Sequence, residues 1–126
     1  MTSNEYVAWS SSRIGSYNPS PLLLGERLYV LYDRGIFGCF NALTGEEVYK
    51  ARLTGGTGQF TTSPWSHDGK IFCSNEYGQT WVLKRGDTFK ILHMNELDEM
   101  FMASPAIANG AMILRGINFL YCVRRQ

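Results

Sequence analysis

The chain lacks the features that mark membrane, secreted and nucleic-acid-binding proteins. No apolar run approaches the roughly 20 residues that a membrane-spanning helix needs. Residues 1–5 are polar and acidic, unlike the basic and then apolar start of a secretory signal. Twelve basic residues stand against eleven acidic ones, and no basic stripe gathers them. We therefore expect no membrane span and no nucleic-acid partner.

Cysteine is scarce, and its spacing predicts no site. Cys39, Cys73 and Cys122 are an odd number, with no Cys-x-x-Cys motif and no histidine at metal-ligand spacing. Each lies in an apolar stretch, so we interpret all three as small buried side chains, although a disulfide between two of them stays open. The composition is 44% apolar and 18% charged, which is ordinary for a globular domain.

What the sequence does contain is an internal repeat. The dipeptide Ser-Pro begins at Ser20, Ser63 and Ser104, at spacings of 43 and 41 residues. After each dipeptide come a glycine and then two apolar stretches separated by a turn. A period of about 40–45 residues with four short strands is typical of a propeller blade.

The repeat divides the chain, taken as a single segment over 1–126, into blade-sized parts. We predict one four-stranded blade over residues 20–53, a second over 63–94, and three inner strands of a third over 104–123. Residues 5–11 resemble the outermost strand of a blade. Short stretches rich in Tyr, Phe, Val, Ile and Leu favour antiparallel strands. The predicted fold is all-β, with about three propeller blades per chain.

Three blades do not close a ring, because propellers have about four to eight. The outer strand at one end and the three inner strands at the other add up to one blade. Two chains would give six blades and three would give nine, each N-terminal strand completing another chain's last blade. We therefore expect self-association, with a homodimer favoured over a trimer. The alternative is that these residues belong to a longer chain.

The stretch from Phe40 to Tyr49 resembles the PQQ-repeat consensus. It reads Phe-Asn-Ala-Leu-Thr-Gly-Glu-Glu-Val-Tyr, where the consensus has an apolar residue, Asp, Ala, any residue, Thr, Gly, Lys, two residues and Trp. Asn41, Glu46 and Tyr49 replace the Asp, Lys and Trp. Residues 102–123 resemble the final blade of PQQ-like propellers, a group that includes the outer-membrane assembly lipoprotein and many uncharacterised bacterial proteins.

This resemblance implies the propeller fold, and it implies a cofactor only for the dehydrogenases of the family. Those are longer chains that hold PQQ and calcium with residues from many blades and carry two adjacent cysteines. This chain has no adjacent cysteines and no calcium-binding acidic constellation. We expect no cofactor and no enzymatic activity; the alternative is the C-terminal fragment of a larger, quinoprotein-dehydrogenase-like propeller. The expected location is cytoplasmic for a complete chain, and periplasmic or extracellular for a fragment.

No catalytic or metal site emerges from the residues. His67-Asp68-Gly69 occupies a position where the other repeats have a turn, so we interpret it as a hairpin turn rather than an acid–base pair. Residues 54–58 are glycine-rich but lack the Gly-Lys-Ser/Thr ending of a phosphate-binding loop. Glu96, Asp98 and Glu99 are interpreted as a solvated acidic loop.

Loops that lead into the inner strands are the predicted binding surface, because ligands and partners of a propeller meet its loops. The residues that we single out there are Tyr17, Gln59, Phe60, Trp65 and Phe101. For Trp65 a core position is also open. The sequence thus favours a non-enzymatic scaffold that binds itself and other proteins.

Overall fold

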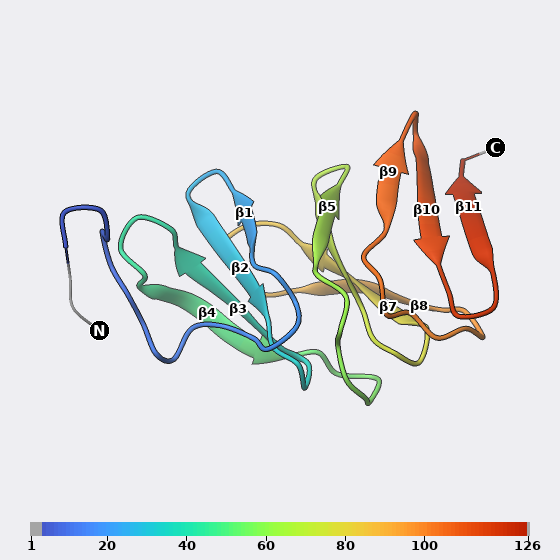
Figure 1. The fold of residues 1–126 in the computed structure, drawn as a ribbon, viewed down its shortest axis with the longest axis horizontal. Helices are drawn as coiled ribbons and strands as arrows, with labels where there is room; N and C mark the ends of the chain where they lie inside the picture. The colour runs from blue at the N-terminus through green and yellow to red at the C-terminus, as the bar shows by residue number, and fades with distance from the viewer. Residues whose placement is uncertain (1–3, 126) are drawn as a thin grey trace.

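The computed structural model describes residues 4–125, which form eleven strands and no helix (Figure 1). The first sheet consists of β1 (Leu22–Leu24), β2 (Arg27–Leu31), β3 (Ile36–Asn41) and β4 (Glu47–Arg52). The second consists of β5 (Trp65–His67), β6 (Lys70–Ser74), β7 (Gln79–Lys84) and β8 (Ile91–Glu96). The third has only three strands, β9 (Ala106–Ala108), β10 (Ala111–Arg115) and β11 (Leu120–Arg124).

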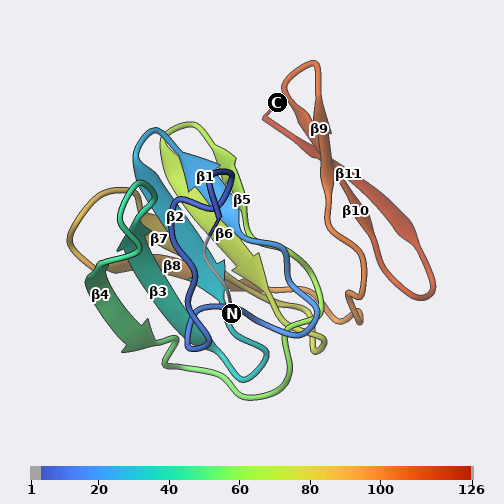
Figure 2. The same cartoon turned by 60° about the vertical axis from the view of Figure 1, so that its left-hand side comes forward.

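Each sheet is an antiparallel meander whose strands lie in chain order. The three sheets stand side by side from the N-terminal to the C-terminal end of the molecule (Figures 1 and 2). They cover residues 22–52, 65–96 and 106–124, against predicted blades over 20–53, 63–94 and 104–123. The predicted all-β architecture of blade-like sheets is confirmed.

Hairpin turns join the first two strands of each sheet. Asp68 and Asn109 have positive φ angles of 51° and 50°, and each precedes a glycine that is also left-handed. Two successive left-handed residues match the right-handed twist of the flanking strands. The interpretation of His67-Asp68-Gly69 as a hairpin turn is therefore confirmed.

Residues 5–11 form no strand, and that prediction is corrected. The segment begins with a turn in which the Val7 amide donates to the Asn4 carbonyl at 3.1 Å. Further along, the Trp9 indole N–H donates to the Ala42 carbonyl at 2.9 Å. The unpaired edge of β11, which this strand was expected to complete in another copy, lies at the opposite end of the molecule (Figure 1).

The core lies between the first and second sheets. Because successive side chains of a strand point to opposite faces, β2 and β3 present one buried row to the second sheet, and β6 and β7 present another in return. With two loop residues these rows make up one buried cluster: Tyr29, Leu31, Phe37, Cys39, Leu53, Phe60, Ile71, Cys73, Trp81 and Leu83. Burial of each large apolar side chain contributes about 1.5–3 kcal/mol.

The third sheet contributes nothing to this cluster. Leu120 and Val123 on β11 are 66% and 49% exposed. Cys122, on the same strand, is exposed too, which corrects its interpretation as a buried residue. Cys39 and Cys73 are buried as expected, and all three cysteines are free thiols. Burial raises the pKa of the Cys73 thiol, so it stays protonated at neutral pH.

Candidate interaction surface

The serines of the Ser-Pro repeat link the three sheets to one another. The Ser20 amide donates to the Ser63 Oγ at 2.8 Å, and the Ser63 amide donates to the Ser104 Oγ at 3.0 Å. Each serine precedes a proline, which restricts it to extended backbone conformations. The repeat thus has a mechanical role that its sequence did not reveal. We call Ser20, Ser63 and Ser104 the serine ladder.

Loop 54–58 crosses from the first sheet to the second. Hydrogen bonds from two side chains of the second repeat hold its backbone in place. The Trp81 indole N–H donates to the Thr54 carbonyl at 2.7 Å. The fully buried Asn75 side chain donates to the Thr57 carbonyl at 2.8 Å. A Cβ on Gly56 would come within 2.7 Å of the Trp81 ring, so the loop needs a glycine at this point. Gly56 therefore allows the loop to pass close to Trp81 as it crosses between the two sheets.

Glu99 anchors the third sheet, contrary to its interpretation as part of a solvated loop. Only 7% exposed, its carboxylate accepts hydrogen bonds from the Met100, Asn118 and Phe119 amides and from the Tyr121 hydroxyl, at 3.2–3.3 Å. Burial alone would raise the pKa of Glu99, but these hydrogen bonds hold it below its ordinary value. Burial and the neighbouring Glu99 charge raise the pKa of the Tyr121 hydroxyl. The two acidic residues near Glu99 in sequence, Glu96 and Asp98, are exposed, so the sequence could not distinguish Glu99 from them.

Three of the five predicted binding residues are packed inside. Phe60 is 3% exposed, with its ring centroid 5.4 Å from that of Trp81. Phe101 is 2% exposed and forms an isolated bridge with Gly116. Trp65 is 8% exposed and stacks on Phe72, in line with the core position that the sequence left open. These side chains support the loops and are not accessible to a partner.

The other two predicted residues, Tyr17 and Gln59, are exposed. Tyr17 is 92% exposed, while its amide donates to the Asp33 carboxylate at 2.8 Å. Burial alone would raise the pKa of Asp33, but the hydrogen bonds from Tyr17 and Asn18 hold it below its ordinary value. The Gln59 carbonyl accepts from the Glu76 amide at 2.9 Å. Both loops are therefore fixed at the backbone and present free side chains.

A cleft separates the second sheet from the third. Its apolar part, a cavity of about 310 Å³, is bordered by Trp65, Phe72, Met112, Leu114 and Val123, together with residues at the ends of β7 and β8. It shares Phe72, Met112 and Val123 with a wider opening of about 590 Å³.

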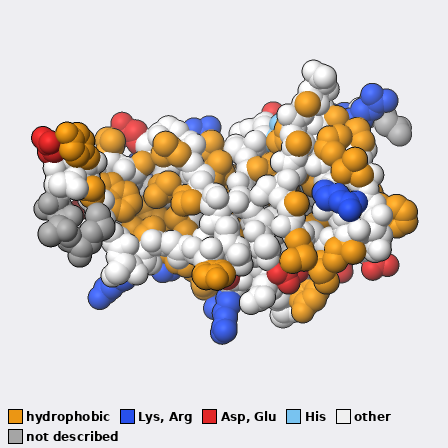
Figure 3. Space-filling model, in the orientation of Figure 1, with side chains coloured by type: hydrophobic (Ala, Val, Ile, Leu, Met, Phe, Trp, Pro, Cys, Tyr) orange, Lys and Arg blue, Asp and Glu red, His pale blue; other side chains and the backbone are white. Residues whose placement is uncertain are grey.

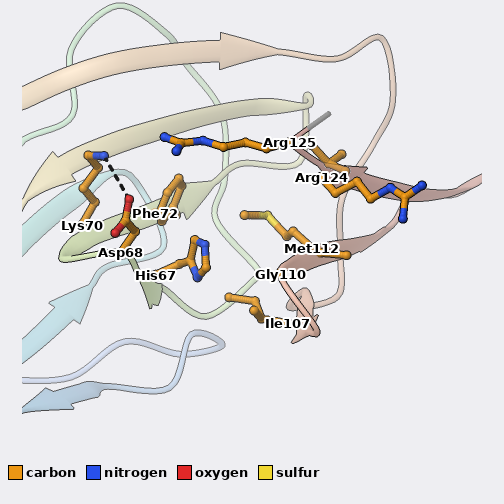
Figure 4. Close-up of a pocket in the computed structure, with 11 residues that line it drawn as sticks. His67, Asp68, Lys70, Phe72, Ile107, Gly110, Met112, Arg124 and Arg125 are labelled. Atoms are coloured by element: carbon orange, nitrogen blue, oxygen red, sulfur yellow. Dashed lines mark ion pairs between the residues drawn. The ribbon is translucent and has the colours of Figure 1, made fainter.

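This opening has basic side chains at its rim, namely Lys70, Arg124 and Arg125. Figure 4 shows Met112 reaching between the two sheets, opposite His67 and Phe72. Lys70 pairs loosely with Asp68, at 3.9 Å between Nζ and Oδ2. The third sheet is therefore only partly packed against its neighbour.

Apolar side chains gather on the surface at the β9–β11 end of the molecule (Figure 3). Within residues 4–125, no three His, Cys, Asp or Glu side chains come close enough to hold a metal ion. The same residues include no helix long and apolar enough to cross a membrane. The sheet at this end of the molecule has three strands, whereas each of the other two has four. We call this three-stranded sheet the unfinished sheet.

Comparison with solved structures identifies the fold. BamB from Moraxella catarrhalis superposes with a TM-score of 0.62 at 14% identity, over 83% of this chain and 31% of that one. The chain has the fold of β-propeller blades, as in this structure. Quinohemoprotein alcohol dehydrogenase from Comamonas testosteroni gives a TM-score of 0.59 at 13% identity, over 77% of this chain and 16% of that one. No family model and no curated protein sequence matches.

These similarities are of fold alone, because the identities are so low. A europium-containing methanol dehydrogenase also matches, with a TM-score of 0.53 at 17% identity over 63% of this chain and 15% of that one. The chain spans less than a third of the length of each of these propellers. The propeller fold that the Phe40–Tyr49 stretch implied is thus present, as a segment of blades.

Proposed function

We propose that this chain is a non-enzymatic propeller scaffold that self-associates to complete a ring. The observation that carries the proposal is the unfinished third sheet. It has three strands where the others have four, and the edge of β11 is unpaired among the described residues. An unpaired edge beside exposed apolar side chains is a site for association with another sheet.

The chemistry of the polar residues supports a scaffold rather than an enzyme. The Glu99 and Asp33 carboxylates are occupied by backbone amides, and the Cys73 thiol is buried. A general base or nucleophile needs a free side chain within reach of a substrate. The exposed side chains of Tyr17 and Gln59, on loops fixed at the backbone, are better suited to contact with another protein.

A second candidate function follows from the comparison of chain lengths. The segment spans 31% of BamB and 16% of the quinohemoprotein dehydrogenase, so the same unfinished sheet would be covered by further blades in a longer protein. Such a protein could be a scaffold or a quinoprotein dehydrogenase. In either case the apolar side chains of β11 would be buried by the next blade.

Light scattering coupled to size exclusion tests the proposal. We expect a discrete dimer for the wild-type chain and a shift to monomer for Leu120→Asp, which places a charge on the exposed apolar strand. Tyr77→Asp is the matched control, because Tyr77 is 60% exposed in the turn between β6 and β7 of the second sheet. A wild-type monomer at every concentration would contradict self-association. An absorbance change on adding PQQ and calcium would contradict the non-enzymatic assignment.

A further inference from the structure

We infer that two copies join head to tail, with the Ser104 amide of one copy donating to the Ser20 hydroxyl of the next. In this arrangement the third sheet of the first copy takes the place that residues 4–17 occupy on the first sheet of the second copy. The inference rests on the proposed self-association and specifies its geometry. Two observations support it. The first and last serines of the ladder each have one group without a hydrogen-bond partner among residues 4–125, and the outer face of the first sheet is covered whereas that of the third is exposed.

The ladder has a direction and is open at both ends. In each observed link the amide of the earlier serine donates to the hydroxyl of the later one. Within residues 4–125 the Ser104 amide has no acceptor and the Ser20 hydroxyl has no partner, and both serines are exposed. The next link therefore needs a serine hydroxyl presented by a following blade. The first blade of a second copy presents Ser20 in the required place.

The third sheet offers an uncovered face to that blade. Ile107, Met112 and Val123 border the cleft toward the second sheet. The alternate residues Ala106, Ile113 and Cys122 are paired across the three strands and point the other way. We call these three residues, together with Leu120, the outward face of the third sheet. Ala106, Leu120 and Cys122 are exposed.

The first sheet has the corresponding face, and there it is covered. Tyr29 and Cys39 point into the core, so Val30 and Phe40 point outward, yet these two are only 0% and 3% exposed. The chain before β1 runs across the first sheet in both views (Figures 1 and 2). Trp9 lies against Gly45, and the Tyr32 hydroxyl donates to the Arg13 carbonyl at 3.2 Å.

This cover is suited to being displaced. Residues 4–17 contain no strand, and from Val7 to Ile14 only the Trp9 and Tyr32 hydrogen bonds join them to the first sheet. Tyr6 is 87% exposed, and Val7, Trp9 and Ile14 are only half-buried. A three-stranded sheet would cover Val30 and Phe40 more completely than this irregular segment. The segment thus acts as a removable cap that competes with a second copy.

Disulfide trapping tests the join. In a Cys122→Ser background, the double variant Ser20→Cys/Ser104→Cys should form covalent dimers or longer chains under mild oxidation, seen on non-reducing gels. Ser20→Cys/Ser63→Cys is the positive control, because these positions are linked within one chain and should crosslink without an increase in mass. Ser104→Cys/Thr88→Cys is the negative control, since Thr88 lies in the exposed loop between β7 and β8.

The outcomes separate this inference from the proposed function. Dimers in light scattering without a 20–104 crosslink would overturn the head-to-tail join and leave self-association standing. A Cys122–Cys122 crosslink in the oxidised wild-type chain would also overturn it, because that bond requires two third sheets face to face. Monomers at every concentration would overturn both.

Truncation provides a second measurement. Deleting residues 2–14 should strengthen association by about tenfold in sedimentation experiments, because the cap no longer competes for the first sheet. Unchanged or weaker association in the truncated chain would contradict the competition between cap and copy.

Discussion

The two spaces between neighbouring sheets are built from the same repeat and packed very differently. Between the first and second sheets the side chains form a buried cluster, whereas between the second and third they leave a cleft with an apolar cavity of about 310 Å³. The serine ladder is the same across both. The repeated backbone arrangement therefore does not determine how densely the side chains pack between two neighbouring sheets.

Individual side chains account for the difference. On the first sheet the paired residues Leu31 and Phe37 face the core. The equivalent pair on the second sheet is Ser74 and Thr80, whose hydroxyls hydrogen-bond to each other instead of filling the space toward the third sheet. Two small polar residues in place of Leu and Phe remove the apolar volume needed for close packing.

Truncating one leucine in each of the two spaces between sheets tests this contrast directly. The leucine between the first and second sheets should show the largest effect. Leu83→Ala removes a side chain that is 0% exposed in the cluster, so it should cost about 2–5 kcal/mol of unfolding free energy. Leu114→Ala makes the same change at a partly exposed position beside the cleft and should cost about 1 kcal/mol. Urea denaturation measures both. Equal losses would mean that the two spaces are equally packed.

Replacing the anchor of the third sheet should have the next largest effect. Glu99→Gln leaves one oxygen to accept from several amides, so we expect a loss of about 1–2 kcal/mol confined to the third sheet. Hydrogen exchange should become faster over residues 111–124 and stay unchanged over 27–52. Asp98→Asn is the matched control, because Asp98 is exposed. Uniformly faster exchange would contradict a local anchor.

Acid should act on the same anchor. The pKa of Glu99 is lowered in the folded chain from its ordinary value of 4.5, so its stabilising contribution is complete at neutral pH. It is lost as the pH falls below 4.5 and through the folded-state pKa. Protection of the 111–124 amides should therefore fall in that range in the wild-type chain, and the fall should be smaller in Glu99→Gln. Identical pH profiles would contradict the assignment.

Removing a ladder hydroxyl should have the smallest effect. Ser63→Ala leaves the partly solvated Ser20 amide without its acceptor, so the cost should be about 0.5–1 kcal/mol. Ser66→Ala, on the neighbouring strand β5, serves as the control. Exchange of the Ser20 amide should rise at least several-fold in Ser63→Ala alone. An unchanged rate would mean that the ladder link contributes nothing measurable.

Much of the fold could be predicted because it depends on local signals. The Ser-Pro spacing and the left-handed Asp68 and Asn109 turns are properties of short stretches, and they locate the strands correctly. The predicted strand over residues 5–11 failed because this segment is held by a turn and by the Trp9 side chain instead of by backbone pairing, and neither contact is evident from its sequence.

The candidate site was less predictable. Phe60 and Phe101 lie in loops, where apolar side chains suggest exposed contacts, yet tertiary packing buries them. Glu99 resembles its acidic neighbours in sequence, and only the folded turn at Asn118 and Phe119 gives it a distinct role. Cys122 lies in an apolar strand that has no cover on its outward side.

Hydrogen exchange at two protein concentrations tests most directly whether association covers the third sheet. Protection of the β10 and β11 amides should rise at least tenfold between low and high concentration, as the outward face of the third sheet becomes covered. The β2, β3, β6 and β7 amides, which lie in the packed cluster, should exchange at the same rate in both samples. Concentration-independent exchange in β10 and β11 would contradict the account.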